Sequence, residues 1–414
     1  MGPARTLRLL IVGLNYAPEP IGIGPYTTGL AQFLAAQGHA VSVVAGQPYY
    51  PQWRKYRGFG GLAVRRTRET GVTVARCPHY VPRVPSGARR ILHHLSFAAT
   101  ALPAAVAAAL RERPDAVICI APSILSMAVA RVAARLARAP LWLHVQDLEI
   151  DAALATGLVA PGRRARLLLA AERALLRSAD RVSSIGQAMI DRLVAKGVAR
   201  ENTCEMRNWA TLRSGASGAA FRREWRLETR TVALYSGSIG RKQGAEVIVE
   251  AARRLAERED IAFVVCGEGP ELGRLKDRAS GLANLQFHPL QPAGRLAELL
   301  ALADVHLLPQ VTAAADLVLP SKLANMLASG RPVVATAEPG TALAAEVAGC
   351  GIVVPPGDAG ALAKAIAALA DDPHRAASLG AAGAARAAER WSAGAILARF
   401  ERRLLALASA ARAA

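Results

Sequence analysis

Residues 231–244 read TVALYSGSIGRKQG, an apolar run followed by a glycine turn and two adjacent cations. The apolar run has the length and composition of a buried strand, and the residues after the cations favour a helix. Gly237 and Gly240 let backbone amides approach an anion closely, and Arg241 and Lys242 can neutralise a diphosphate. This order predicts an α/β unit with a phosphate site at the end of its first strand.

Two further strand exits downstream have a similar character. Residues 264–272 read VVCGEGPEL, in which the turn consists of Gly267, Glu268 and Gly269. Residues 318–335 read VLPSKLANMLASGRPVVA, and we predict that Ser321 and Lys322 begin a helix that Gly330 ends. Three exits of this kind in one half of the chain indicate that this half binds phosphate groups.

The same alternation extends over most of the 414 residues. Short apolar runs alternate with Ala- and Leu-rich amphipathic stretches, as in βαβ units whose parallel sheets are covered on both faces. We predict an α/β protein with two doubly wound, Rossmann-like domains that face each other across a cleft holding the active site. The predicted strands of the first series are 8–14, 40–45, 72–76, 116–120, 141–145 and 181–184. Those of the second are 231–236, 261–266, 285–288, 305–308, 332–335 and 351–354.

The domain boundaries follow from where this periodicity stops. The polar stretch 211–226 is typical of a flexible linker. We therefore predict an N-terminal domain over residues 1–210 and a C-terminal domain over 226–390. Residues 391–414 are Ala-rich and helical by propensity, and this segment is a candidate for packing back across the domain junction.

Composition excludes several classes of protein. With 52% hydrophobic residues the chain can bury a large core. Its five cysteines are far apart, with no CxxC or His-linked spacing, so we expect reduced thiols and no metal site. The apolar run 9–14 is too brief for a signal-peptide core, and we expect a cytoplasmic location. The G-x-x-x-x-G-K-[ST] spacing is absent, which disfavours a P-loop nucleotide site.

The net charge of +19 is concentrated in the first half of the chain. Residues 1–225 hold 30 Lys and Arg against 13 Asp and Glu, a net of +17, whereas residues 226–414 have a net of +2. A one-sided basic domain suits nucleic acid, anionic lipid headgroups or phosphorylated substrates, and codon bias in a GC-rich genome is the alternative explanation. No nucleic-acid reader motif is present in the sequence, so we expect no nucleic-acid partner.

Residues 91–110 form an uncharged stretch long enough to span a bilayer. It is dominated by Ala and contains two histidines and a proline, so we predict a peripheral or buried helix instead. Arginines flank it on both sides, at Arg83, Arg89, Arg90, Arg111 and Arg113. This arrangement suits contact with anionic lipids, and an ordinary packing helix is the alternative.

Two strand exits of the first domain hold further candidates. Gly22 and Gly24 permit close backbone approach to a ligand, although a tight strand-to-helix turn would also require glycine. His144 ends the strand 141–145 and is followed by Asp147. A histidine in that position either faces a ligand or is a satisfied structural residue.

The order of these motifs resembles the retaining glycosyltransferases of family 4, which have two Rossmann-like domains in the GT-B arrangement. The resemblance extends from about Leu9 to about Trp391. Three stretches, 15–45, 143–151 and 320–323, most resemble the branch that builds colanic-acid-type exopolysaccharides.

The resemblance implies transfer of a sugar from a nucleotide-diphosphate sugar, UDP- or GDP-linked, with retention of the anomeric configuration. No metal and no further cofactor are expected. Together with the basic first domain, it implies a polyprenyl-diphosphate-linked saccharide as acceptor and an enzyme peripheral to the inner face of the plasma membrane. A soluble acceptor, or a catalytically silent paralogue that binds nucleotide sugar, are the alternatives.

The resemblance also implies roles for individual residues. Arg241 and Lys242 would lie on the diphosphate and His144 would face the donor sugar, which makes these three the catalytic candidates. The implied donor-binding residues are Gly237, Gly240, Gly267, Glu268, Gly269, Phe287, Leu290, Asp316, Ser321, Lys322 and Asn325. The cleft loop and acceptor residues are Gly22, Gly24 and Asp147. Asp147, Glu149 and Asp151 either bind sugar hydroxyls or pair with neighbouring arginines.

The sequence departs from the family at a pair of glutamates that members often have, eight positions apart. Alignment on residues 328–333 places Leu317 and Asn325 at these positions. Asn325 can still hydrogen-bond a ribose hydroxyl, or it faces solvent on its helix. Leu317 cannot replace a carboxylate, which leaves the neighbouring Asp316 as a candidate.

Overall fold

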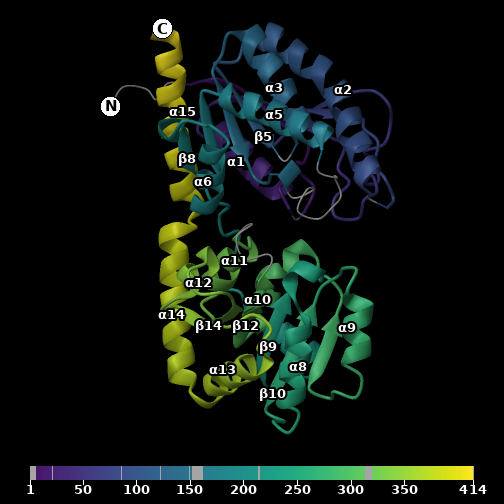
Figure 1. Ribbon diagram of the computed structural model, residues 1–414, viewed down its shortest axis with the longest axis vertical. Coiled ribbons are helices and arrows are strands. Elements are labelled where there is room, and N and C mark those ends of the chain that lie inside the picture. The colour runs from purple at the N-terminus through teal and green to yellow at the C-terminus, as the bar shows by residue number, and fades with distance from the viewer. Residues whose placement is uncertain are drawn as a thin grey trace. The chain divides into compact units, whose positions relative to one another are not determined.

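The computed structural model describes residues 6–413 except Ile21, Pro85, Pro122, Glu149, 152–161, 213–214 and 313–318. The chain divides into two compact units. The first comprises Met1–Arg207 with Gly394–Ala414, and the second comprises Asn208–Ala393. Each unit is built around its own sheet (Figure 1).

The described residues of the first unit form an eight-stranded sheet in the order β3-β4-β2-β1-β5-β6-β7-β8. All neighbours are parallel except β3, which pairs antiparallel with β4. The central strands are almost wholly buried, as expected when helices cover both faces. The strands are β1 Arg8–Gly13, β2 Ala40–Gly46, β3 Arg65–Glu69, β4 Val72–Cys77, β5 Ala116–Ala121, β6 Leu141–Val145, β7 Arg181–Ser184 and β8 Thr203–Glu205.

The helices of the first unit connect these strands. They are α1 Gly24–Ala36, α2 Gly87–Glu112, α3 Ile124–Ala137, α5 Arg163–Arg177, α6 Gln187–Ala195 and the short 3-10 helix η1 Arg200–Asn202. Helices α2, α3 and α5 lie next to one another (Figure 1). The C-terminal helix α15, Ala393–Ala413, packs on this unit as well, so the chain crosses back as the fold prediction allowed.

The described residues of the second unit form a six-stranded parallel sheet in the order β11-β10-β9-β12-β13-β14. Strand β9 lies between β10 and β12, so the strand order reverses there, and such a switch point is where doubly wound sheets bind ligands. The strands are β9 Thr231–Ser236, β10 Ile261–Cys266, β11 Leu285–His288, β12 Val305–Leu308, β13 Val333–Thr336 and β14 Gly351–Val354. The helices are α7 Ala219–Glu224, η2 Arg241–Gln243, α8 Glu246–Arg254, α9 Leu272–Arg278, η3 Ala293–Arg295, α10 Leu296–Leu302, α11 Lys322–Ala328, α12 Ala342–Val347, α13 Ala359–Asp371 and α14 Pro373–Arg390.

The predicted fold class is confirmed, and the twelve predicted strands are present within one or two residues at each end. Two strands were not predicted. Strand β3 reads RRTRE and is largely exposed at the sheet edge, so it has no apolar alternation, and β8 is only three residues long. Neither pattern carries the periodicity from which strands are predicted.

The predicted linker 211–226 is wrong in its second half. Residues 219–224 form helix α7, and Phe221 and Trp225 are buried in a core cluster of the second unit. These two aromatics are four residues apart and lie on one helical face, which anchors a stretch that otherwise looks polar. The described part of this segment therefore belongs to the second unit.

Candidate functional site

The exit of strand β9 packs directly against the exit of β10. A Cβ built on Gly267 would lie 1.9 Å from the carbonyl oxygen of Gly237, and one on Gly269 would lie 2.1 Å from the carbonyl oxygen of Ile239. The backbone amide of Gly237 donates to the carbonyl oxygen of Cys266 (2.9 Å), and the backbone amide of Ile239 donates to the backbone carbonyl oxygen of Glu268 (2.8 Å). Gly267 and Gly269 are thus required by backbone packing between the two turns, in addition to any approach of a ligand.

Lys322 brings a cation to the same place. It is the first residue of α11, and its Nζ donates to the carbonyl oxygen of Ser236 (3.4 Å) and lies 4.1 Å from the ring centroid of Tyr235. Gly237 has a φ of +130°, and a Cβ there would lie 3.2 Å from Nζ. The ammonium lies among protein atoms, and this burial lowers the pKa of Lys322 to about 7. The predicted motifs around residues 237 and 322 therefore meet at the switch point.

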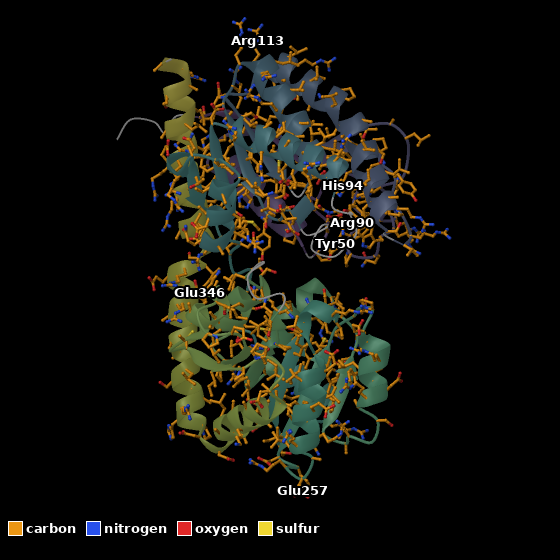
Figure 2. The ribbon with its side chains drawn as sticks, viewed as in Figure 1. Tyr50, Arg90, His94, Arg113, Glu257 and Glu346 are labelled. Carbon is orange, nitrogen blue, oxygen red and sulfur yellow. The ribbon has the colours of Figure 1, made fainter. Side chains whose placement is uncertain are left out.

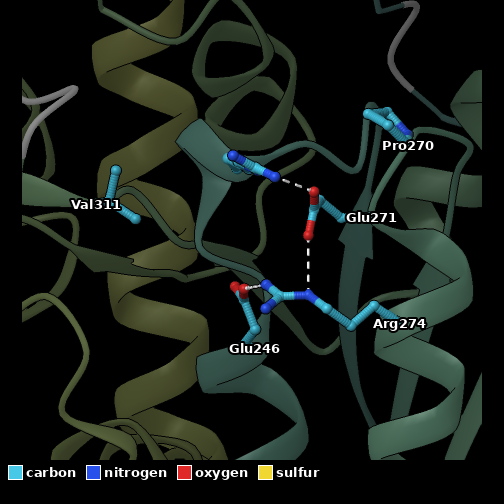
Figure 3. Close-up of a pocket in the computed structure, with 6 residues that line it drawn as sticks. Glu246, Pro270, Glu271, Arg274 and Val311 are labelled. Carbon is cyan, nitrogen blue, oxygen red and sulfur yellow. Dashed lines mark hydrogen bonds and ion pairs between the residues drawn. The ribbon is translucent and has the colours of Figure 1, made fainter.

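A cavity of about 480 Å³ lies next to this turn. Figure 3 shows the charged network that crosses it. Arg241 Nε lies 3.3 Å from Glu271 Oε1, Arg274 Nε lies 2.9 Å from Glu271 Oε2, and Arg274 also pairs with Glu246. The Arg241 side chain is 91% exposed, so its guanidinium is accessible to an anion. The side chain of Lys242 lies outside the described residues.

The stretch from Phe287 to Leu290 adjoins the β10 exit. The amide of Gly267 donates to the carbonyl oxygen of His288 (3.0 Å), and the His288 ring stacks on Trp225 at 3.7 Å between centroids and 11° between planes. Burial lowers the pKa of His288, which favours the neutral ring. Phe287 packs against the core of the second unit. The residues predicted to lie beside the base are therefore part of the same edge as the glycine turns.

The side chain of Asn325 hydrogen-bonds to residues 211–212, near the start of the second unit. Its Oδ1 accepts from the amides of Thr211 (2.7 Å) and Leu212 (3.1 Å), and its Nδ2 donates to Thr211 Oγ1 (3.2 Å). The amide thus anchors this segment to α11. Asp316 and Leu317, the other positions considered for the missing glutamate pair, lie outside the described residues. Ser321 is the exposed residue that precedes α11.

In the first unit, His144 is buried at the end of β6 and both of its ring nitrogens have partners. Nδ1 lies 2.9 Å from Ser183 Oγ, which also accepts from Trp142 Nε1 (2.8 Å). Nε2 lies 3.0 Å from the side-chain nitrogen of Gln146, so Nε2 accepts and Nδ1 donates. Burial lowers the pKa of His144 to about 4, which keeps the ring neutral near pH 7. A neutral imidazole can orient a hydroxyl but cannot neutralise a phosphate.

The acids after β6 have different surroundings. Asp147 is exposed, and its Oδ1 accepts from the amide of Leu148 (2.8 Å). Asp151 pairs with Lys196 (2.6 Å), which also binds the buried Glu172 (2.5 Å). Glu149 lies outside the described residues. Asp151 thus pairs with a lysine, whereas one of the two alternatives predicted from the sequence was pairing with neighbouring arginines.

Gly24 lies beside a buried carboxylate, Glu19, which was not predicted as a site residue, and Gly22 lies beside the ring of Tyr50. Glu19 accepts from the amides of Tyr49 (2.9 Å) and Tyr50 (3.0 Å) and from Asn15 Nδ2 (2.9 Å). A Cβ on Gly24 would lie 2.9 Å from the Glu19 Cβ, which explains glycine at the start of α1 without a ligand. Burial raises the pKa of Glu19. The sequence feature that could have indicated a structured carboxylate here is the position of Glu19 between Pro18 and Pro20.

Two family models match the chain. Residues 22–209 match a glycosyl transferase 4-like domain, and residues 219–386 match the glycosyl transferases group 1. The chain is 41% identical over 348 residues to WcaI of Escherichia coli (strain K12), which is named for glycosyl transfer in colanic acid biosynthesis. That match covers 81% of this chain and 85% of the relative. The chain belongs to the family 4 glycosyltransferases.

Solved structures agree on the fold of this glycosyltransferase. Anabaena Alr3699/HepE in complex with UDP has a TM-score of 0.68 at 17% identity, and the match covers 96% of this chain and all of that one. Sucrose-phosphate synthase from Thermosynechococcus elongatus has a TM-score of 0.71 at 20% identity, covering 97% of this chain and all of that one. Both likenesses identify the GT-B fold.

Within the second unit, the glycosyltransferase brings together the glycine turns, Lys322 and the 287–290 stretch. Tyr235, Glu246, Glu271 and Arg274 also belong to this edge and were not predicted as site residues. Tyr235 could have been found from the sequence, because it lies in the predicted buried strand 231–236 and the hydroxyl of a buried tyrosine usually has a hydrogen-bond partner. The glutamates gave no signal, because their role depends on contacts between different helices.

Proposed function

We propose that this glycosyltransferase moves a sugar from a nucleotide-diphosphate sugar, UDP- or GDP-linked, to a polyprenyl-diphosphate-linked saccharide during assembly of an exopolysaccharide. Transfer proceeds with retention of the anomeric configuration and without a metal ion. The similarity to WcaI supports the exopolysaccharide, and the UDP and UDP-glucose complexes of Anabaena HepE support the donor class.

The observation that carries the proposal is the ammonium of Lys322 beside the Gly237 turn. Among the described residues, no carboxylate lies within ion-pair distance of this ammonium. A cation at a switch point, next to a glycine turn and an exposed Arg241, suits a diphosphate.

The chemistry explains why cations are needed here. Cleaving the bond between sugar and phosphate leaves a nucleoside diphosphate, so charge develops on the leaving phosphate in the transition state. Lys322, Arg241 and Lys242 stabilise that charge, and the leaving phosphate accepts the proton of the acceptor hydroxyl. His144 is given no role in this step, because it is buried and both of its ring nitrogens have partners within the first unit. No general base needs to be assigned.

The proposal of a membrane-bound acceptor is supported by a surface that we call the α2 patch. It consists of Val84, Ile91, Leu92 and Leu95, all exposed, and of the exposed Arg83, Arg89 and Arg90. Ile91, Leu92 and Leu95 lie on the face of α2 opposite to His93, His94 and Phe97, which are buried in the first unit. Figure 2 shows Arg90 and His94 on α2, and because they are four positions apart they lie on the same side of the helix. In the described residues, α2 is also the helix with the length and composition to cross a membrane, with 33% of its apolar window buried. Exposed leucines beside arginines suit the headgroup region of an anionic leaflet, which would hold the enzyme at the inner face of the plasma membrane.

The donor is tested by thermal unfolding in the presence of UDP, GDP, dTDP and ADP. A ligand at ~100 times its dissociation constant stabilises the folded state by about 2.7 kcal/mol, so one diphosphate should raise the melting temperature selectively. Binding without turnover on a lipid-linked acceptor would indicate a silent paralogue. No shift with any diphosphate would overturn the donor assignment.

The membrane surface is tested by sedimentation with phosphatidylglycerol vesicles. Replacing Arg83, Arg89 and Arg90 by Glu should strongly reduce co-sedimentation. A matched control replaces three exposed arginines elsewhere, Arg375, Arg399 and Arg402, with the same change in net charge. If both triple variants sediment like the wild type, the acceptor is better sought among soluble saccharides.

A further inference from the structure

Tyr235 lies between the two elements that meet at the exit of β9. It is the fifth residue of that strand and is fully buried. Its hydroxyl donates to the carbonyl oxygen of Ser238 (2.5 Å), three residues further along the chain and inside the glycine turn. The phenol therefore ties the strand to the turn that follows it.

The face of the same ring supports Lys322. The ammonium lies 4.1 Å from the ring centroid, within the range of a cation–π interaction. It also contacts the carbonyl oxygen of Ser236 at 3.4 Å, at the edge of hydrogen-bond distance. A π face and a carbonyl hold a cation in place without neutralising its charge, so the charge stays available to an anion.

A glycine completes the arrangement. Any side chain at residue 237 would begin 3.2 Å from the Lys322 Nζ, so glycine there leaves the ammonium room beside the turn. The strand, the turn and α11 thus converge on one tyrosine, although Lys322 is 87 positions away in the sequence.

We propose that Tyr235 is a positioning residue for the donor diphosphate: its ring fixes the ammonium of Lys322, and its hydroxyl fixes the Gly237–Gly240 turn against that ammonium. This inference rests on the proposed function, because it names how the donor site is organised. Tyr235 itself is too deeply buried to touch the donor.

The test is a double-mutant cycle in the full chain, read by calorimetric titration with the diphosphate that stabilises the wild type. Tyr235→Leu should weaken binding about 5- to 30-fold, because the cation loses its π face. Tyr235→Phe keeps the ring and should retain most of that affinity, losing only the tie to Ser238. In a Lys322→Met background, Tyr235→Leu should cost little further affinity, since the group that it positions is gone. Thermal unfolding of each variant reports whether it is folded.

The outcomes separate the two proposals. Failure of the wild type to bind any nucleoside diphosphate would contradict the proposed function. Binding by the wild type together with equal losses for Tyr235→Leu in both backgrounds would show a structural tyrosine and overturn the inference. If Tyr235→Leu does not fold, Tyr235→Phe is the deciding variant, because it keeps the ring and removes only the hydroxyl. If its affinity for the diphosphate is as low as that of Lys322→Met, the ring alone does not position the ammonium and the inference is wrong.

Discussion

Lys322 carries a charge that depends on pH close to neutrality. Burial lowers its pKa to about 7, and burial raises the pKa of Tyr235, whose ring faces it, so the phenol stays neutral. The ammonium is present below pH 7 and is lost as the pH rises through that value. A bound anion favours the ammonium, so binding takes up a proton.

We therefore expect the affinity for a nucleoside diphosphate to be full below pH 7 and to fall above it, by up to about tenfold per pH unit. Calorimetry between pH 6 and 9 measures this. Lys322→Arg should bind with a flat profile, because a guanidinium does not titrate in this range. A wild-type profile as flat as that of Lys322→Arg would contradict the role given to the lysine.

Gly267 is the residue at which backbone packing is tightest, since a Cβ there would lie 1.9 Å from a carbonyl oxygen. We expect Gly267→Ala to destabilise the second unit by about 1–3 kcal/mol or more, because the turns must separate. Gly273→Ala is the matched control: this glycine is in α9 with nothing within 4 Å of its Cβ position, and the change should be neutral or stabilising. Urea unfolding of both variants tests this prediction. Equal unfolding midpoints for Gly267→Ala and Gly273→Ala would show that close backbone packing is not what requires glycine at residue 267.

At the scale of elements, α15 packs on the first unit through an apolar stripe and through two charged pairs. Leu397, Phe400, Leu404 and Ala408 are buried, and Phe400 lies 4.5 Å from Trp142 between ring centroids. His39 Nε2 lies 3.1 Å from Glu401 Oε1, and Arg412 pairs with Asp115. The helix therefore contributes directly to the core that also positions β6 and His144.

Phe400→Ala should lower the free energy of unfolding of the first unit by about 3–5 kcal/mol, the usual cost of removing a buried phenylalanine. Urea unfolding followed by circular dichroism measures this loss. Arg402→Ala, on the exposed side of the same helix, should change the midpoint little. A similar, small effect of both changes would mean that the helix is only loosely attached.

At the scale of the whole molecule, charge is unevenly distributed between the halves of the chain. The net of +17 in residues 1–225 predicts that binding to anionic vesicles depends on salt, since screening weakens the attraction. Co-sedimentation with phosphatidylglycerol vesicles should fall steeply as sodium chloride is raised, while apolar residues of the α2 patch leave a salt-resistant remainder. Equal sedimentation with uncharged phosphatidylcholine vesicles at all salt concentrations would contradict an electrostatic contribution.

The sequence by itself determined the fold class and most of the strands. These follow from local patterns: apolar runs of strand length, amphipathic stretches between them and glycine turns at the strand exits. The short edge strands β3 and β8 and the helix α7 were not predicted. Strand β3 is charged and exposed, β8 has three residues, and α7 is anchored by two aromatic residues within an otherwise polar stretch.

Tertiary structure alone decided what the side chains do. Asn325 anchors residues 211–212, Glu19 holds the loop at residues 49–50, and Tyr235 meets Lys322 across 87 positions. A motif indicates which residue types gather at the carboxyl ends of parallel strands. Which atoms pair there, and which charges are left without a partner among the described residues, depends on packing between elements that no local pattern records.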